Sequence, residues 1–385
     1  MKKLLLAAMA TLLFSCSGSD DSNVNPNPNP VGICDNVYTG NVELKTQAEV
    51  DAFGVKNYCR VTGFVKIGNV ENSDIFSLSA LQNLETVEGA LWIASNHSLT
   101  NLHGLEKLTK VGGDLVISFN SKITVINELS GLMQIGSYEN KSKLVIGSNN
   151  ALTSINGLEH IASIYEINIS NNPQLTNFSG LEGISKAGGI WIIGNDGLQN
   201  LKGLENITET DYFTLMENEA LQSLVHLSGL KKVNVRFILQ ENRKLADLNG
   251  LENLETAGNF TVGDNEALLS LDGLDKLHAV SQLIIHDNPR LTSLSHLSAL
   301  TSVVSNTVDG VVKTPLLQFI ELPITSLDGL QNITAFEGGR INVYECLELT
   351  DYCSVKALIP GSVIEFRENA YNPTKEDIIA GKCAQ

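Results

Sequence analysis

The sequence lacks the features that point to a nucleic-acid binder or to an enzyme of a familiar class. It has 26 basic against 43 acidic side chains, a net charge of −17, which makes nucleic acid and anionic membrane surfaces unfavourable partners. It contains no HExxH, GxSxG, GxxxxGK[ST] or CxxC motif and no D-x-[DN]-x-[DN]-G calcium loop. We therefore expect no nucleic-acid partner, no cofactor and no catalytic residue.

The seven histidines also lack the spacing of a metal site. His226 and His296 occupy the same position of a repeat that is described below. They lie three repeats apart, or about 14 Å at the spacing of stacked strands, which is too far to share a metal. A glycosidase would need two carboxylates about 5–10 Å apart across a cleft, and acidic residues in a repeat are expected on its solvent face. The sequence predicts neither a metal site nor an enzyme, although some β-helices carry catalytic carboxylates on their flanks.

The chain has no apolar run of the roughly 20 residues that a transmembrane helix needs. The run Leu4–Phe14 follows two lysines and precedes small residues and Cys16, which is typical of an export signal. Its end, "LFSC", resembles a bacterial lipoprotein signal, in which residues 1–15 are removed and Cys16 is lipidated. An ordinary secretory signal with a chance cysteine is the alternative.

A polar, proline-punctuated segment follows the signal. Residues 16–32 have no apolar period, so we expect a flexible tether. The acidic "SDD" at 19–21 resembles the short signal that sends some Gram-negative lipoproteins to the outer face of the outer membrane.

A phrase built around an asparagine recurs every 23 to 33 residues. It aligns Asn72, Asn96, Asn120, Asn149, Asn172, Asn195, Asn218, Asn242, Asn265 and Asn288, with Glu321 and Cys346 then in the same position. Periods of 20 to 50 residues indicate a solenoid, an array or a propeller.

Each repeat combines strand alternation with apolar residues at steps of three. Leu91 and Ile93 precede Asn96, and leucines then follow it at intervals of three. Such steps sweep around a helix without forming one face, so a long helix is disfavoured. A coil of about 12 stacked turns, bent around a narrow apolar core, places all of these residues inside. We expect the asparagines to turn inward and pair with backbone groups, and the glycine eight residues later to mark a corner.

This pattern resembles a known repeat family. The segment "LWIASNHSLTNLHGLEKLTKVGGDLVISFN" (91–120) is similar to the receptor L-domain repeat, which also occurs in bacterial surface lipoproteins. The resemblance covers roughly residues 60–355 and implies a right-handed, mainly β, leucine-rich β-solenoid with short helical caps at both ends. Longer turns at 137–143 and 305–315 and the glutamate at position 321 depart from the pattern.

The cysteines divide between the ends and the repeats. We expect an N-terminal cap at 33–62, solenoid repeats at 63–352 and a C-terminal cap at 353–385. Each cap holds a short helix, and in an oxidising compartment disulfides are expected between the cap cysteines. The predicted pairs are Cys34 with Cys59 and Cys353 with Cys383. Cys346 stands in the asparagine position and is expected to be a buried structural thiol.

The strand residues four places before each asparagine are predicted to face outward. This set, which we call the outer row, includes both tryptophans and several branched aliphatics: Trp92, Val116, Val145, Asn168, Trp191, Thr214, Ile238, Thr261 and Ile284. Contiguous exposed apolar area is typical of contact sites, although strand propensity alone also favours such residues. Trp92, Trp191, Ile238 and Ile284 are the candidate ligand-binding residues.

The predicted lipid anchor, the flexible tether and the rigid coil together predict a lipid-anchored surface protein of the outer membrane. Such a protein would bind a protein or cell-surface ligand. The alternative is a glycan-binding accessory lipoprotein of a polysaccharide-uptake system, since tryptophan rings stack on sugars. A spacer without any ligand is a third interpretation.

Overall fold

The computed structural model describes residues 34–69, 73–308 and 310–385. The predicted signal at 1–15, Cys16, the tether at 16–32 and Asn72 lie outside this part of the chain. No helix in the described ranges is long and apolar enough to cross a membrane.

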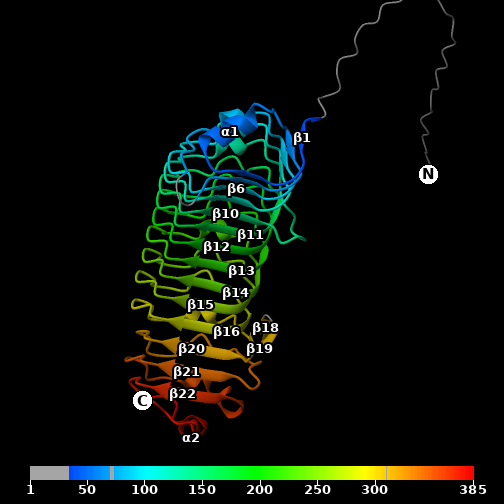
Figure 1. The fold of residues 1–385 in the computed structure, drawn as a ribbon. Coiled ribbons are helices and arrows are strands. Elements are labelled where there is room, and N and C mark those ends of the chain that lie inside the picture. Colours follow the sequence, from blue (N-terminus) through cyan, green and yellow to red (C-terminus); the bar gives the residue numbers. More distant parts are fainter. Residues whose placement is uncertain (1–33, 70–72, 309) are drawn as a thin grey trace, which may run out of the picture. The chain divides into compact units, whose positions relative to one another are not determined.

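The described chain is a leucine-rich β-solenoid, in which one strand per turn adds to a long parallel sheet (Figure 1). Fourteen strands stack in chain order along its main path, where the sequence predicted about 12 turns. The count was too low because the first and last strands come from segments that were assigned to the caps. The strands are β2 (Val42–Leu44), β4 (Val65–Ile67), β6 (Leu91–Ala94), β8 (Leu115–Ser118), β10 (Lys143–Gly147), β11 (Ser163–Ser170), β12 (Lys186–Ile193), β13 (Glu209–Met216), β14 (Lys232–Gln240), β15 (Thr256–Gly263), β16 (Ala279–His286), β20 (Leu316–Ile320), β21 (Arg340–Tyr344) and β22 (Val363–Arg367).

A second, five-stranded sheet accompanies the first turns. It consists of β1 (Val37–Tyr38), β3 (Arg60–Val61), β5 (Thr86–Val87), β7 (Lys110–Val111) and β9 (Gln134–Ile135). From β11 to β16 the two short strands of a turn are replaced by one strand of eight or nine residues. After β16 the turn splits again, because β17 (Ser302–Val303) pairs with the start of β16 and β20 pairs with its end.

The apolar residues at steps of three form the core of the coil. In the turn after Asn96, Leu99, Leu102, Leu105 and Leu108 have no exposed surface. Buried phenylalanines stack between turns, with the ring centroid of Phe237 lying 5.3 Å from Phe213 and 4.8 Å from Phe260. Because no turn covers its own apolar residues, each depends on its neighbours.

The corner glycine is required by both conformation and space. Gly203 has φ +106°, and a Cβ there would lie 2.0 Å from the carbonyl oxygen of Phe178 in the preceding turn. The same position has a positive φ in six other turns, at Gly104, Gly157, Gly180, Gly250, Gly273 and Gly329. The predicted corner is confirmed.

The asparagines form a hydrogen-bonded ladder inside the coil. The Asn172 N–H donates to Asn195 Oδ1 at 3.1 Å, and the Asn195 N–H donates to Asn218 Oδ1 at 3.1 Å. Asn195 Nδ2 also donates to the Ile169 carbonyl at 2.9 Å. The nine asparagines predicted to line the inside of the coil are all fully buried: Asn96, Asn120, Asn149, Asn172, Asn195, Asn218, Asn242, Asn265 and Asn288. The buried amides therefore satisfy one another and the backbone at the bend.

The position predicted for Glu321 is wrong by one residue. Strand pairing aligns His286 with Ile320, so Leu322 occupies the asparagine position and is buried. Glu321 instead lies at the corner just before it. The error arose because the insertion before this turn is ten residues longer than a simple repeat allows, and the repeat alone does not fix where the extra residues end.

The ladder resumes beyond Leu322 and continues further than the sequence indicated. Cys346 has no exposed surface, and burial raises the pKa of its thiol to about 11. Its backbone N–H donates to Asn369 Oδ1 at 2.9 Å. The Asn369 N–H and Nδ2 donate in turn to Asn372 Oδ1. Asn372 thus ends the ladder.

Short helices and disulfides lie at both ends of the coil. Helix α1 (Gln47–Gly54) begins with a capping box between Thr46 and Glu49, and α2 (Lys375–Ile379) begins with one between Thr374 and Asp377. Single 3-10 turns make up the remaining helical structure: η1 (Ser79–Leu81), η2 (Asn127–Leu129), η3 (Val225–Leu227), η4 (Ser295–Leu297), η5 (Cys353–Val355) and η6 (Ile359–Gly361).

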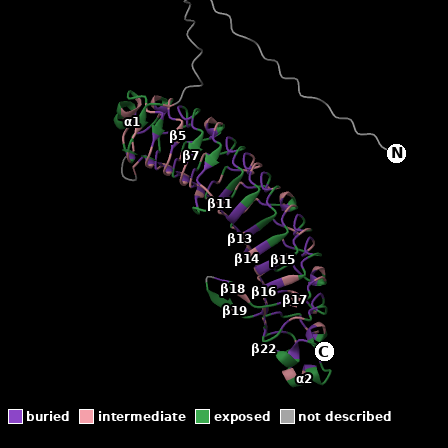
Figure 2. Ribbon diagram, turned by 90° about the vertical axis from the view of Figure 1, so that its right-hand side faces the viewer, coloured by how far each residue is buried: buried purple, intermediate pink, exposed green. Residues whose placement is uncertain are grey.

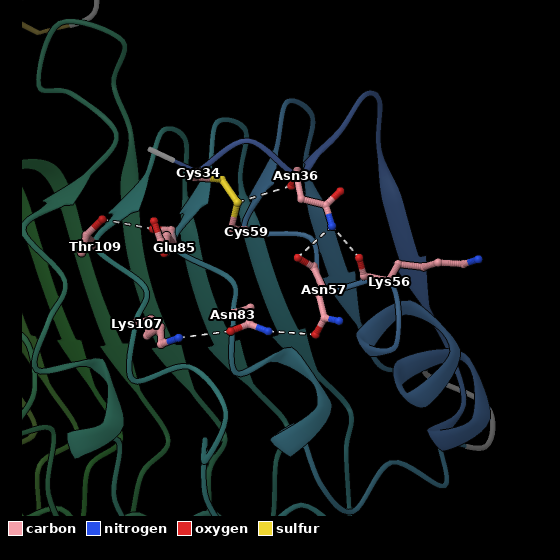
Figure 3. The surroundings of a disulfide bond; sticks show 9 residues. All are labelled: Cys34, Asn36, Lys56, Asn57, Cys59, Asn83, Glu85, Lys107 and Thr109. Atoms are coloured by element: carbon pink, nitrogen blue, oxygen red, sulfur yellow. Dashed lines mark hydrogen bonds between the residues drawn. A yellow bond between two sulfur atoms is a disulfide. The ribbon is translucent and has the colours of Figure 1, made fainter. Parts of the chain in front are cut away.

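One disulfide joins Cys34 to Cys59 and another joins Cys353 to Cys383. Around the first, Asn36 Nδ2 donates to the carbonyls of Lys56 and Asn57, and Asn83 links Asn57 to the next turn (Figure 3). The disulfide and these bonds attach the first strand to the coil.

Candidate binding groove

Two insertions leave the coil at the same corner. The first, residues 137–142, lies between β9 and β10, and the second lies between β17 and β20 and contains the hairpin of β18 (Asn306–Val308) and β19 (Val311–Lys313). Six long strands, β11 to β16, lie between them in the sheet. Figure 2 shows the hairpin standing away from the coil beside β16. The sequence identified both segments as long turns but did not predict that they bracket one stretch of sheet.

The two insertions approach each other over the starts of the long strands. Tyr138 of the first insertion lines a cavity of about 380 Å³ together with Lys186, Glu209, Asp211 and Asn234. From the second, Asn306 Nδ2 donates to the Asn234 carbonyl at 3.1 Å, across 72 residues of sequence. Val304 lines a further hollow with Asn234, Gly258 and Ser281 among others. These two hollows share Asn234, and together, from Tyr138 to Val304, we call them the groove.

A lysine side chain lies over one of two packed tyrosine rings at the Tyr138 end of the groove. Lys186 Nζ lies 3.9 Å from the centroid of the Tyr138 ring, which in turn packs edge-on against Tyr165 at 5.5 Å. Burial, together with the negative charge of Asp211, raises the pKa of the Tyr138 hydroxyl. The hydroxyl therefore stays protonated at neutral pH and can donate a hydrogen bond to a ligand.

A β-bulge shapes the middle of the groove. The register between β13 and β14 shifts between Thr210 and Tyr212, so β14 has an extra residue there. Asn234, at the bulge, donates from Nδ2 to Glu209 and to Asp211, each at 2.9 Å. Bulges re-aim side chains and are frequent beside functional sites. The sequence does carry a signal for this one, because the spacing from Asn218 to Asn242 is 24 where its neighbours are 23.

Between the insertions, the outer row lies on the outer face of the same long strands, further along them than the residues that line the groove. Trp191 lies over Gly189, where a Cβ would come within 2.2 Å of its ring, and it stacks on Tyr212 with centroids 5.9 Å apart. The ring of Tyr165 similarly covers Gly188. The glycine pair in β12 therefore makes room for two aromatic rings.

The four candidate binding residues all lie on the outer face of the sheet, where each is half-buried. Trp191 in β12, Ile238 in β14 and Ile284 in β16 lie between the two insertions. Trp92 lies in β6, beyond the first insertion, and packs against Phe64 with ring centroids 5.2 Å apart. The structure thus places three of the four between the two insertions, beside the groove but not in its lining, and separates Trp92 from it.

A row of carboxylates follows the opposite ends of the strands. The residue before each ladder position has a positive φ and is acidic in seven successive turns: Glu217, Glu241, Asp264, Asp287, Glu321, Glu345 and Glu368. We call this set the acidic corner. The charge of Asp287, above all, raises the pKa of the Glu321 carboxyl. The sequence does carry a signal for this row, since each of these residues directly precedes a ladder position, but the row was not predicted and Glu321 was aligned with the asparagines.

Two mixed clusters among the described residues have the composition of metal ligands. One comprises Asp264, His286 and Asp287, and the other comprises Asp272, Asp275 and His296. The sequence predicted no metal site after testing only whether two histidines share a position. Each cluster arises instead from one histidine and nearby carboxylates: His286 meets Asp287 of its own turn and Asp264 of the preceding turn, whereas both partners of His296 lie in the preceding turn.

Comparisons with known proteins give only a distant structural likeness. No family model matches the sequence, and no curated protein matches it. One similar solved structure is an internalin from Listeria monocytogenes, with a TM-score of 0.46 and 17% sequence identity over 87% of this chain and 79% of that chain. The receptor L-domain resemblance therefore stays a prediction, and the solenoid is established from its own strand pairing.

Proposed function

We propose that this protein is a cell-surface binding protein that holds an extended protein or cell-surface ligand in the groove. The observation that carries the proposal is the convergence of the two insertions, one from each side, on a single stretch of six long strands. Binding loops positioned by a rigid scaffold are a common arrangement in recognition proteins. The half-buried apolar side chains of the outer row, next to the polar residues that line the groove, also match the composition of protein interfaces.

The proposal includes the predicted anchor. A lipid on Cys16 and a flexible tether at 16–32 would hold the solenoid away from the outer membrane with the groove accessible. Protease treatment of intact cells tests this part, because a surface-exposed protein is digested and one that faces inward is protected.

A substitution on the outer row tests the groove itself. Ile238→Glu places a charge on the outer row between the two insertions, beside the groove, and is expected to abolish binding of the purified protein to intact target cells. Val116→Glu is the matched control, since Val116 occupies the same row in β8, beyond the first insertion, and should bind as wild type. Equal loss in both variants, with both folded, would contradict the proposal.

Glycan binding is the second candidate, and the pair of Trp191 and Tyr212 favours it. Two near-parallel rings beside the carboxylates of Glu209 and Asp211 match the stacking and hydroxyl-binding groups that a sugar needs. On a glycan array, Trp191→Ala would then lose a signal that Trp92→Ala retains. Absence of any signal from the wild type would remove this candidate and leave the protein ligand.

A further inference from the structure

We propose that Asp264, His286 and Asp287 form a binding site for one divalent transition-metal ion of the zinc type. The site lies at the ends of β15 and β16, away from the groove at their starts, and does not depend on the proposed function. Its three ligand atoms all lie within 4.8 Å of one another.

The distances within the cluster fit a metal ion. His286 Nδ1 lies 2.8 Å from Asp287 Oδ2 and 3.6 Å from Asp264 Oδ2. Ligands at about 2.0–2.2 Å from a tetrahedral zinc ion are about 3.4 Å apart, so small side-chain rotations bring all three atoms to bonding distance. Nitrogen and carboxylate oxygen are both ligands that zinc accepts.

The position of the imidazole is fixed from its other side. The His286 ring lies across Gly263, where a Cβ would be 2.2 Å from the ring, and its Nε2 lies 3.0 Å from the side-chain amide of Gln240 two strands away. The Gln240 atom at this distance is Nε2, which donates to the ring as placed; with the amide turned by 180°, its oxygen accepts the His286 Nε2 proton instead and leaves the Nδ1 lone pair directed at the two carboxylates. Metal-binding histidines are commonly held in this way by an outer hydrogen bond. Gln240 is therefore a positioning residue.

The surroundings supply negative charge and access. A cavity of about 340 Å³ is lined by the two aspartates, three glutamates, Arg243 and Pro289. Arg243 is directed to Glu219 and Glu266, at 3.5 and 3.4 Å, so it neutralises neither aspartate of the site. The ion would keep an open face toward this cavity, where water completes its coordination.

The second cluster provides an internal comparison. His296 Nδ1 lies 3.0 Å from Asp275 and 3.8 Å from Asp272, but its side chain is 33% exposed against 18% for His286. Among the described residues, no side chain from another strand holds the His296 ring in the way that Gln240 contacts His286. We expect this cluster to bind the ion at least tenfold more weakly.

Titration of the purified full chain with ZnCl₂ in a non-chelating buffer at pH 7.4, followed by calorimetry, tests the site. We expect one equivalent to bind with micromolar affinity in the wild type, and His286→Gln and Asp264→Asn to weaken it at least tenfold. Gln240→Ala should weaken it as well, by up to tenfold, without loss of fold. His296→Gln is the matched control and should bind as wild type.

Three results would overturn the site. They are no binding by the wild type at 1 mM ZnCl₂ (about the weakest affinity class), unchanged affinity in both folded His286→Gln and Asp264→Asn, or a loss confined to His296→Gln. Calcium provides the last test, because a site that depends on imidazole nitrogen is not emptied by CaCl₂ at tenfold excess over zinc. Emptying by calcium would show a site made of carboxylates alone.

Discussion

At the scale of single residues, the asparagine ladder shows how far chemistry can be predicted from position. A polar residue repeated within an apolar phrase has to satisfy its hydrogen bonds inside the coil, and this requirement placed nine asparagines correctly. It failed at Glu321, because a glutamate next to the correct position satisfies the spacing nearly as well as Leu322 does. Spacing across an insertion therefore identifies the turn but not the residue.

Loss of one ladder residue is expected to be costly. Asn218 Nδ2 donates to the carbonyls of Ile192 and Met216, and Asn218 Oδ1 accepts from the Asn195 N–H. Asn218→Ala leaves these buried groups unpaired and should lower the free energy of unfolding by about 3 kcal/mol, measured by urea denaturation.

Asn206→Ala is the control for the ladder variant. Asn206 is exposed and donates a single bond to the Glu182 carbonyl, so its loss should cost less than about 1 kcal/mol. Equal costs for the two variants would mean that the ladder contributes no more than a surface hydrogen bond.

At the scale of elements, the strands and corners were predictable and the groove was not. Period and alternation located one strand per turn of the main sheet from β4 to β21, and the corner glycines followed from the same phrase, but neither the five-stranded sheet nor the β18–β19 hairpin was predicted. The groove depends on contacts such as Asn306 with Asn234, between segments that no local pattern relates. The merging of two short strands into one from β11 to β16 also has no signal in the apolar period, because the buried positions are the same in both arrangements.

The corner glycine gives a prediction at this scale. Gly203→Ala places a Cβ against the Phe178 carbonyl at a φ of +106° and should lower the free energy of unfolding by more than about 2 kcal/mol. Gly310→Ala, in the hairpin insertion, has a φ of +76° but nothing within 4 Å, so only the backbone strain of about 1 kcal/mol remains. The free energies of unfolding of the two variants, measured by urea denaturation, distinguish the cost of the clash with the neighbouring turn from the cost of backbone strain alone. Similar values would show that the approach of neighbouring turns is not what requires glycine.

At the scale of the whole molecule, the coil is held together by contacts between neighbouring turns, together with a disulfide at each end. Stability in such a chain is approximately the sum of the contributions of its turns and of the interfaces between them. The ladder and the core keep their register when a complete turn is removed, whereas removal of half a turn places polar residues inside.

Deletion of residues 97–120, one turn outside the groove, tests this modularity. The cut joins Asn96 to Ser121 and leaves Ile123 in the place of Leu99, so the protein should fold and resist protease at 25 °C. Deletion of residues 97–108, half as long, should abolish the cooperative thermal transition seen by circular dichroism. A folded product from the shorter deletion, or an unfolded one from the longer, would contradict a coil built from equivalent turns.

The shared corner of the two insertions has a consequence for the size of the ligand. Neither loop contributes a strand to the main sheet between β11 and β16, so we expect that whole turns can be added or removed there while both loops stay intact. Each such change alters the separation of the loops by one strand spacing, about 4.8 Å. The distance between the two insertions therefore changes only in fixed steps. If the groove binds an extended ligand as proposed, related chains with more or fewer turns would fit longer or shorter ligands without any change in either loop.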